Sequence, residues 1–157
     1  MTAPTLYPAK YSGTAVDYNR AKVDRSGALR TEAVTVTVPS STASGTVIGL
    51  VPFRKGARFI CNASGVFTTD IDTGTAVTAS VGYVYDDNVT YTNAPAAFVS
   101  ASTIPQTGGI IPVTGLATAY TFVAAADGWI TVTTGGGTTT TAGTISAQIT
   151  LAYDGLV

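Results

Sequence analysis

The chain has 157 residues and a formal net charge of −1, with 45% hydrophobic and only 11% charged residues. Disordered chains are rich in charge and poor in apolar residues, so this composition excludes intrinsic disorder and predicts one folded domain with an ample core. No apolar run approaches the ~20 residues of a membrane-spanning helix or has the form of a signal peptide, so we expect a protein made in a cytosol, without a membrane partner.

The N-terminal stretch differs in composition from the rest of the chain. Residues 1–33 contain isolated charges, prolines and glycines without a sustained hydrophobic period, which predicts an extended N-terminal arm before a β-sandwich domain over residues 34–157. Three tyrosines, Tyr7, Tyr11 and Tyr18, argue against a purely solvated tail. Fully extended, ~33 residues reach roughly 110 Å at ~3.3 Å each, far enough to lie across a neighbouring subunit.

The remainder of the chain carries strand signals. Thr occupies 29 positions and Leu only 6, and branched side chains such as Thr and Val favour pleated surfaces. Residues 34–38 alternate strictly between Val and Thr, and residues 145–153 place Ile, Ala, Ile, Leu and Tyr on one face. The predicted strands, in chain order, are 34–38, 46–51, 57–62, 77–85, 97–101, 120–124, 129–133 and 145–153.

About eight antiparallel strands with turns between them and no strong helix predict a jelly-roll-like β-sandwich. Trp129 opens a strand and is expected in the core. Two low-complexity stretches are expected to be loops, 104–115 and the Gly/Thr-rich 133–144. The apolar pair Ile110 and Ile111 either marks a contact surface or tucks under the sandwich.

The sequence contains few residues suited to catalysis. There is no histidine, which removes Ser-His-Asp and Cys-His mechanisms and most zinc sites. The single cysteine, Cys61, lies in a predicted strand and is expected to be buried and inert. Asp70–Gly74 resembles a fragment of a calcium loop, but aspartate and glycine are also ordinary turn residues. We therefore expect no enzyme activity, no cofactor and no metal.

Charge is distributed unevenly along the chain. Residues 1–58 contain all eight Lys and Arg but only three acidic residues, whereas residues 59–157 contain six Asp and no basic residue. This asymmetry suggests contact with an acidic partner or head-to-tail association of copies. The candidate partner-binding residues are Arg20, Lys22, Arg25 and Arg30 in the arm, and Arg54, Lys55 and Arg58 around Gly56.

Two interpretations of these basic residues remain open. They are either solvated surface charges or a docking site for an acidic protein surface, where Arg side chains pair with carboxylates. Nucleic acid is not the expected partner, because the sequence pI is near 5.0 and aromatic residues do not interleave with the bases.

Three stretches give the chain a family resemblance: VTVTVPSSTASGTVIGLVPFRKGARFI after the arm, then AYTFVAAADGWITVTTGGG and ISAQITLAYD. In composition and layout the chain resembles the small capsid decoration, or cement, proteins of tailed bacteriophages. The resemblance implies a homotrimer on the outer capsid surface of the virion that clamps neighbouring major capsid protein subunits. It carries over no individual site residue.

A second virion role is also open, that of a tail, fibre or spike-associated module that binds a receptor or another virion protein. This alternative predicts exposed aromatic side chains on loops, for which Tyr91 and Trp129 are the candidates.

Overall fold

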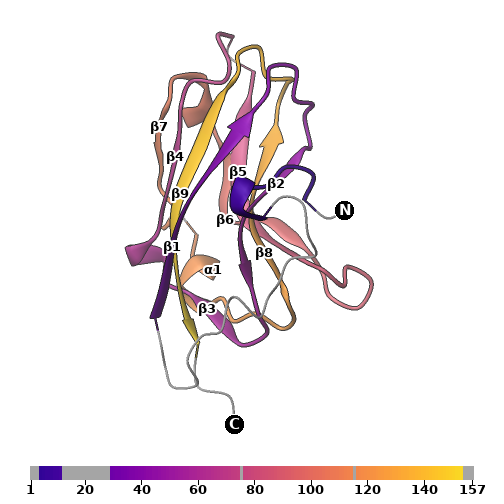
Figure 1. The fold of residues 1–157 in the computed structure, drawn as a ribbon, viewed down its shortest axis with the longest axis vertical. Coiled ribbons are helices and arrows are strands. Elements are labelled where there is room, and N and C mark those ends of the chain that lie inside the picture. The colour runs from indigo at the N-terminus through magenta and orange to yellow at the C-terminus, as the bar shows by residue number, and fades with distance from the viewer. Residues whose placement is uncertain (1–3, 12–28, 75, 115, 154–157) are drawn as a thin grey trace.

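The computed structural model describes residues 4–11, 29–74, 76–114 and 116–153. In this part of the chain two antiparallel sheets pack face to face as a β-sandwich, shown with its long axis vertical in Figure 1. The predicted all-β sandwich is therefore confirmed. No helix within the described ranges is long and apolar enough to cross a membrane.

The strand order is that of a jelly roll. The first sheet has the order β1 (Leu29–Val38), β9 (Gly143–Tyr153), β4 (Gly65–Thr68) and β7 (Gly109–Ile111), and β3 (Ala57–Phe59) also pairs with β9. The second sheet has the order β2 (Val47–Phe53), β8 (Gly128–Gly135), β5 (Thr78–Tyr85) and β6 (Ala94–Ser102). In both sheets, strands from the first part of the chain alternate with strands from the last part, as two interleaved Greek keys require.

Helical segments are short in the described residues. The α-helix α1 spans Thr118–Thr121, and single 3-10 turns occur at η1 (Ala9–Tyr11), η2 (Cys61–Ala63) and η3 (Ile104–Gln106). Figure 1 shows α1 and β3 together at the lower end of the sandwich.

The Val/Thr alternation of β1 places alternate side chains on opposite faces of the strand, as the sequence predicts. Val34, Val36 and Val38 are buried in the core, while Thr35 and Thr37 face outward. β1 pairs with β9 from Leu29 opposite Ala152 to Val38 opposite Gly143. On the outer face, the hydroxyl oxygens of Thr35 and Ser146 lie 3.0 Å apart and those of Thr31 and Thr150 lie 2.9 Å apart. The hydroxyl groups of this threonine-rich chain thus pair across strands as the valines fill the core.

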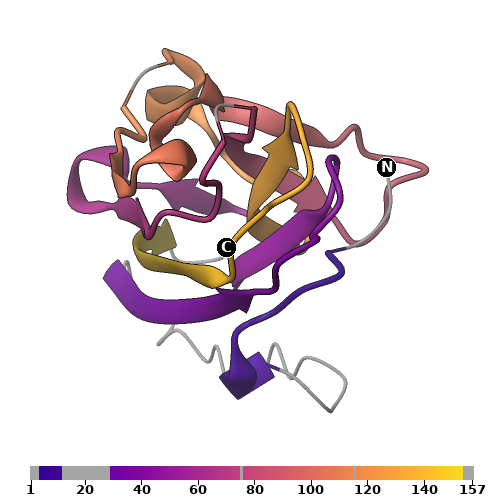
Figure 2. The same cartoon turned by 90° about the horizontal axis from the view of Figure 1, so that it is seen from above.

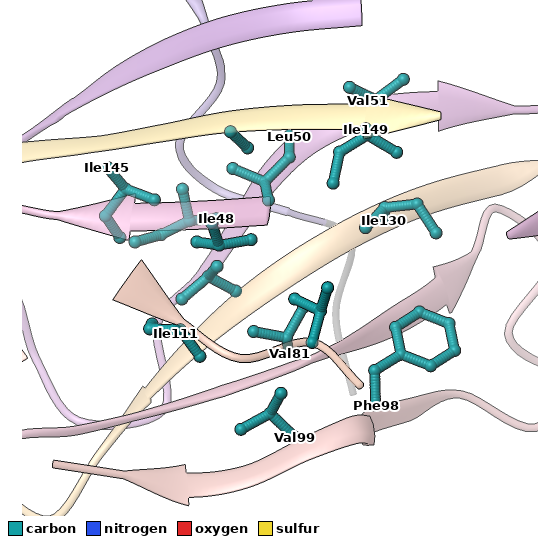
Figure 3. Close-up of a cluster of buried hydrophobic side chains, with 14 of the residues drawn as sticks. Ile48, Leu50, Val51, Val81, Phe98, Val99, Ile111, Ile130, Ile145 and Ile149 are labelled. Carbon is teal, nitrogen blue, oxygen red and sulfur yellow. The ribbon is translucent and has the colours of Figure 1, made fainter. Parts of the chain in front are cut away.

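The core lies between the two sheets and receives side chains from both (Figure 3). Ile145 and Ile149 of β9 face Ile48 and Ile130 of the second sheet, and all four are fully buried. Burial of apolar surface on this scale is the main stabilising contribution in a domain with so few charges.

Two predicted strands are corrected, and the first is 57–62, because β3 ends at Phe59 and the 3-10 turn η2 begins at Cys61. Residues 120–124 were expected to form a strand, but α1 ends at Thr121 and the chain then continues as an extended segment. Phe122 inserts its ring among Tyr83, Phe98 and Phe53, with centroid distances of 4.5, 5.4 and 5.7 Å. This aromatic packing at the end of the sandwich overrides the alternating pattern. The short strands β4 and β7 were not predicted.

The beginning of the described chain packs on the body. Residues 4–11 lie against the outside of the sandwich, as the indigo segment in Figure 2 shows. β1 begins at Leu29, before the expected boundary between arm and body at residue 34. Residues 12–28 lie outside the described residues.

Loops at the upper end of the sandwich are joined by a buried carboxylate. Asp72 is 1% exposed and accepts hydrogen bonds from the backbone N–H groups of Gly74, Ala76 and Val77 at 2.9–3.1 Å. The Thr140 hydroxyl donates to it at 2.9 Å. The Val77 N–H and these other donors lower the pKa of the Asp72 carboxyl below its ordinary value, against the opposing effect of burial. The Gly/Thr-rich loop is thus fixed to the body by side chains.

We predict that Asp72→Asn lowers the melting temperature at pH 7 by several degrees, because an amide cannot accept all four bonds. A carboxyl with a lowered folded pKa stabilises the protein above its unfolded pKa of ~3.9, and that contribution is lost as the pH falls through the folded pKa. Melting curves from pH 7 to pH 2 should therefore fall less steeply for Asp72→Asn than for the wild type.

The comparison variant is Asp87→Asn in the exposed loop between β5 and β6. The pKa of Asp87 is lowered as well, chiefly by the Thr90 N–H, but solvent screens this exposed group. We expect its melting temperature to match the wild type. If the melting temperatures of the wild type and of Asp72→Asn fell equally steeply with pH, the role given to Asp72 would be contradicted.

Candidate partner-binding surfaces

The bend between β2 and β3 presents the basic residues of the body. Gly56 has φ +84°, a conformation that favours glycine, and its N–H donates to the Ala124 carbonyl at 2.8 Å. Lys55 and Arg58 are exposed at this bend, whereas Arg54 is half-buried. The bend therefore offers two cationic side chains to a partner and keeps the third partly inside the body.

Acidic groups lie beside the same bend. The Asp127 carboxylate accepts a hydrogen bond from the Lys55 backbone N–H at 2.8 Å, and the Asp86 N–H donates to the Asp127 carbonyl at 3.1 Å. Both aspartates are exposed. The separation of charge along the sequence is consequently not a separation in space, because this end of the sandwich carries both signs.

The arm bases divide into two groups. Arg30 lies in β1, where its guanidinium forms an ion pair with Glu32, and its side chain is only 19% exposed. Glu32 also accepts a hydrogen bond from the Tyr11 hydroxyl at 2.8 Å. Arg30 thus contributes to a partly buried polar cluster of the body. Arg20, Lys22 and Arg25 lie outside the described residues.

An uncharged groove crosses the outer face of the first sheet. Phe67 of β4 and Ile110 of β7 are paired opposite one another and are 45% and 68% exposed. Ala33, Gly65 and the Ser146–Gln148 stretch of β9 form the floor of a hollow of about 460 Å³ beside them. The pair Ile110 and Ile111 is therefore divided, because Ile111 is fully buried and Ile110 faces solvent.

The two aromatic candidates for receptor binding, Tyr91 and Trp129, are at least half-buried. Trp129 is buried at 3% exposure, but it lies in a small cluster apart from the main core. Tyr7 and Tyr11 cover it, with ring centroids 5.0 and 5.5 Å from the indole. Tyr91 is half-buried and packs against Tyr85 at 5.5 Å.

The described residues contain no arrangement suited to catalysis through histidine or a metal cluster. No three Cys, Asp or Glu side chains come together there as a metal site would require. Cys61 is buried at 4% exposure, as predicted. The carboxylate of the suspected calcium loop, Asp72, is occupied by four protein donors.

Sequence reasoning located the basic bend but missed the groove and the cover of Trp129. The groove depends on Phe67 and Ile110 meeting across two short strands that carry no clear pattern. The cover depends on contact between segments that are more than a hundred residues apart, which no local signal reveals.

Comparison with solved structures finds the same fold in chains of two phage capsids. A chain from the capsid of Ralstonia phage GP4 matches with a TM-score of 0.65 and 23% identity, over 86% of this chain and 90% of that one. A chain from the Cyanophage Pam1 capsid asymmetric unit matches with a TM-score of 0.61 and 16% identity, over 82% and 86%. No protein-family model matches the sequence, and no curated protein is significantly similar to it.

Proposed function

We propose that the chain is a structural protein of a bacteriophage virion that decorates the capsid and stabilises it by clamping neighbouring major capsid protein subunits. One observation carries the proposal, namely that the jelly roll matches chains of two phage capsids over almost the whole length of each chain. A fold alone hosts many functions, so the surface chemistry must supply the rest of the argument.

The body has the properties that a clamp needs. Strain from a filled capsid is resisted by a rigid element, and here a continuous core between two sheets is closed at the upper end by the Asp72 hydrogen bonds. The absence of histidine means that almost nothing in the protein titrates near neutral pH. Such a body serves mechanical contact better than chemistry, and we propose no enzymatic activity.

The lower end of the sandwich is the proposed docking end. Lys55 and Arg58 would pair with carboxylates of the capsid surface, while Asp86 and Asp127 beside them would meet its basic groups. Mixed charge of this kind selects a partner and an orientation more than it adds affinity. Arg54, the third base of the bend, is half-buried.

The segment before β1 is proposed as a second attachment. Its bases Arg20, Lys22 and Arg25 precede Leu29, where the body begins. Contacts through the arm and the bend would be linked, and linked weak contacts raise overall affinity without a tighter individual site. In a homotrimer on the outer capsid surface, three such pairs would act together. The protein would be made in the host cytoplasm before it joins the virion.

The alternative, a tail or fibre module that binds a receptor, has less support. Of its two aromatic candidates, Tyr91 is half-buried and Trp129 is covered, while Tyr120 of α1, which was not among the candidates, is 57% exposed.

We predict that Lys55→Glu combined with Arg58→Glu weakens binding to capsids lacking this protein by at least tenfold, as measured by cosedimentation. Both side chains are exposed, so the melting temperature of the free protein should change little. The control is Ser40→Glu with Ser44→Glu, which adds two acids at exposed positions in the turn at the opposite end of β2 and removes no base. An equal loss of capsid binding in both double variants, or no loss of capsid binding in Lys55→Glu/Arg58→Glu, would contradict docking through the bend.

A second prediction concerns the arm. Deletion should stop at residue 28, because removing residues 1–33 would also remove half of the β1–β9 pairing. We expect the shortened chain to keep the circular dichroism spectrum of a β protein and to cosediment several-fold less with capsids. Unimpaired cosedimentation of a folded, shortened chain would show that the arm does not attach the protein.

A further inference from the structure

The outer face of the second sheet carries a small apolar cluster separate from the main core. Val47 of β2, Val84 of β5 and Trp129 of β8 form this cluster, and each is at most 3% exposed. In the described part of the chain no second layer of sheet covers this face. Their burial comes from Tyr7 and Tyr11 of the N-terminal segment, which pack on them.

The two tyrosines hold the indole ring from two sides. Tyr7 meets Trp129 at a centroid distance of 5.0 Å and an interplanar angle of 61°, and Tyr11 meets it at 5.5 Å and 84°. These edge-to-face arrangements are the ones that aromatic quadrupoles favour. The segment is therefore anchored by oriented contacts with a single tryptophan.

Backbone pairing adds to the aromatic contacts. The Thr5 N–H donates to the Val47 carbonyl, and the Gly49 N–H donates to the Leu6 carbonyl, each at 2.8 Å. Leu6 thereby forms a parallel bridge to Ile48 of β2, the edge strand of its sheet. This is the pattern by which an extended peptide adds to an exposed sheet edge.

Gly49 is the feature that makes room for the segment. A Cβ at this position would lie 3.0 Å from the Trp129 ring, 3.0 Å from the Tyr7 ring and 3.2 Å from the Pro4 Cβ. Its backbone does not have the positive φ that would call for glycine. The bare backbone at residue 49 thus fits the incoming peptide, and we call Val47, Gly49, Val84 and Trp129 together the Trp129 slot.

We propose that the Trp129 slot is a peptide-binding site that accepts the Pro4–Tyr11 segment of a second copy of this chain, so that neighbouring copies can exchange their N-terminal segments. All contacts that hold the segment are made by residues 4–11 and the body, and none depends on which chain supplies the segment. The inference concerns contact between copies and does not rest on docking to a capsid.

The length of the connection supports exchange. Tyr11 contacts Glu32 of β1 in its own chain, so the segment and the start of the body lie close together. Residues 12–28 join them, and when extended they span roughly 56 Å at ~3.3 Å each. That reach exceeds what the intrachain path needs and is sufficient for the slot of an adjacent copy. Copies held side by side would present their segments at millimolar effective concentration, which favours weak exchange contacts.

The single tryptophan reports directly on the slot. The acceptor is the full chain with Tyr7→Ala and Tyr11→Ala, which should leave its slot open and shift Trp129 emission to longer wavelength than in the wild type. The donor is the full chain with Gly49→Val and Trp129→Phe, which has an intact segment, a blocked slot and no indole signal. Mixing the two should shift acceptor emission back toward the wild-type wavelength in a saturable manner and produce a 1:1 complex in sedimentation velocity.

The matched control donor also carries Tyr7→Ala and Tyr11→Ala, and it should produce neither effect. If the first donor does not fold, as judged by circular dichroism, a synthetic peptide of residues 1–11 replaces it and should give the same saturable shift. A lack of response to ~1 mM donor or peptide, or an equal response to the control donor, would show that the segment binds only within its own chain. An acceptor with wild-type emission would overturn the slot itself.

The glycine offers an independent test in the otherwise unchanged chain. Gly49→Ala should displace the segment and shift Trp129 emission to longer wavelength. Gly65→Ala is the control, because a Cβ there meets nothing within 4 Å. Identical emission from the two variants would contradict the role assigned to Gly49.

Discussion

The pairing of β9 with strands from the beginning of the chain is the interaction on which the rest of the structure depends. β1, β3 and β4 all hydrogen-bond to β9, so one strand at the end of the chain organises the first sheet. The inner face of β9 also supplies Ile145, Ile149 and Leu151 to the core. The β1–β9 pairs are more than a hundred residues apart in the chain. Contacts of such long range cost loop-closure entropy before they are formed, and jelly rolls fold slowly for that reason.

Once the two sheets are closed over their core, few places remain for recognition. The inner faces are apolar, and the outer face of the first sheet carries small and hydroxyl side chains beside the exposed pair Phe67 and Ile110. Charged side chains gather at the lower end, where Lys55, Asp86 and Asp127 lie on loops and Arg58 lies in the adjoining strand β3. The second sheet uses its outer face differently, because Tyr7 and Tyr11 close over Trp129 there. A body with one charged end and one peptide-binding face is suited to joining other proteins.

Strict alternation was the part of the sequence from which structure could be predicted. Residues 34–38 and 145–153 form strands with the expected inward faces, because period-two burial is a local property of each strand. β4 and β7 have four and three residues and contain glycine, so they carry no readable period. Phe122 shows the opposite error, since an alternating stretch became a helix end when its ring entered an aromatic cluster. The sequence could not show that folding brings Asp127 next to Lys55, because the two residues are far apart in the chain.

The most direct test of the structural role is the copy number of this protein in purified phage particles from its source, determined by quantitative mass spectrometry. A capsid-decorating protein must be present in numbers comparable with the major capsid protein, and that is the result we predict. A handful of copies per particle would point to the tail or a unique vertex, and absence from particles would contradict a virion role altogether.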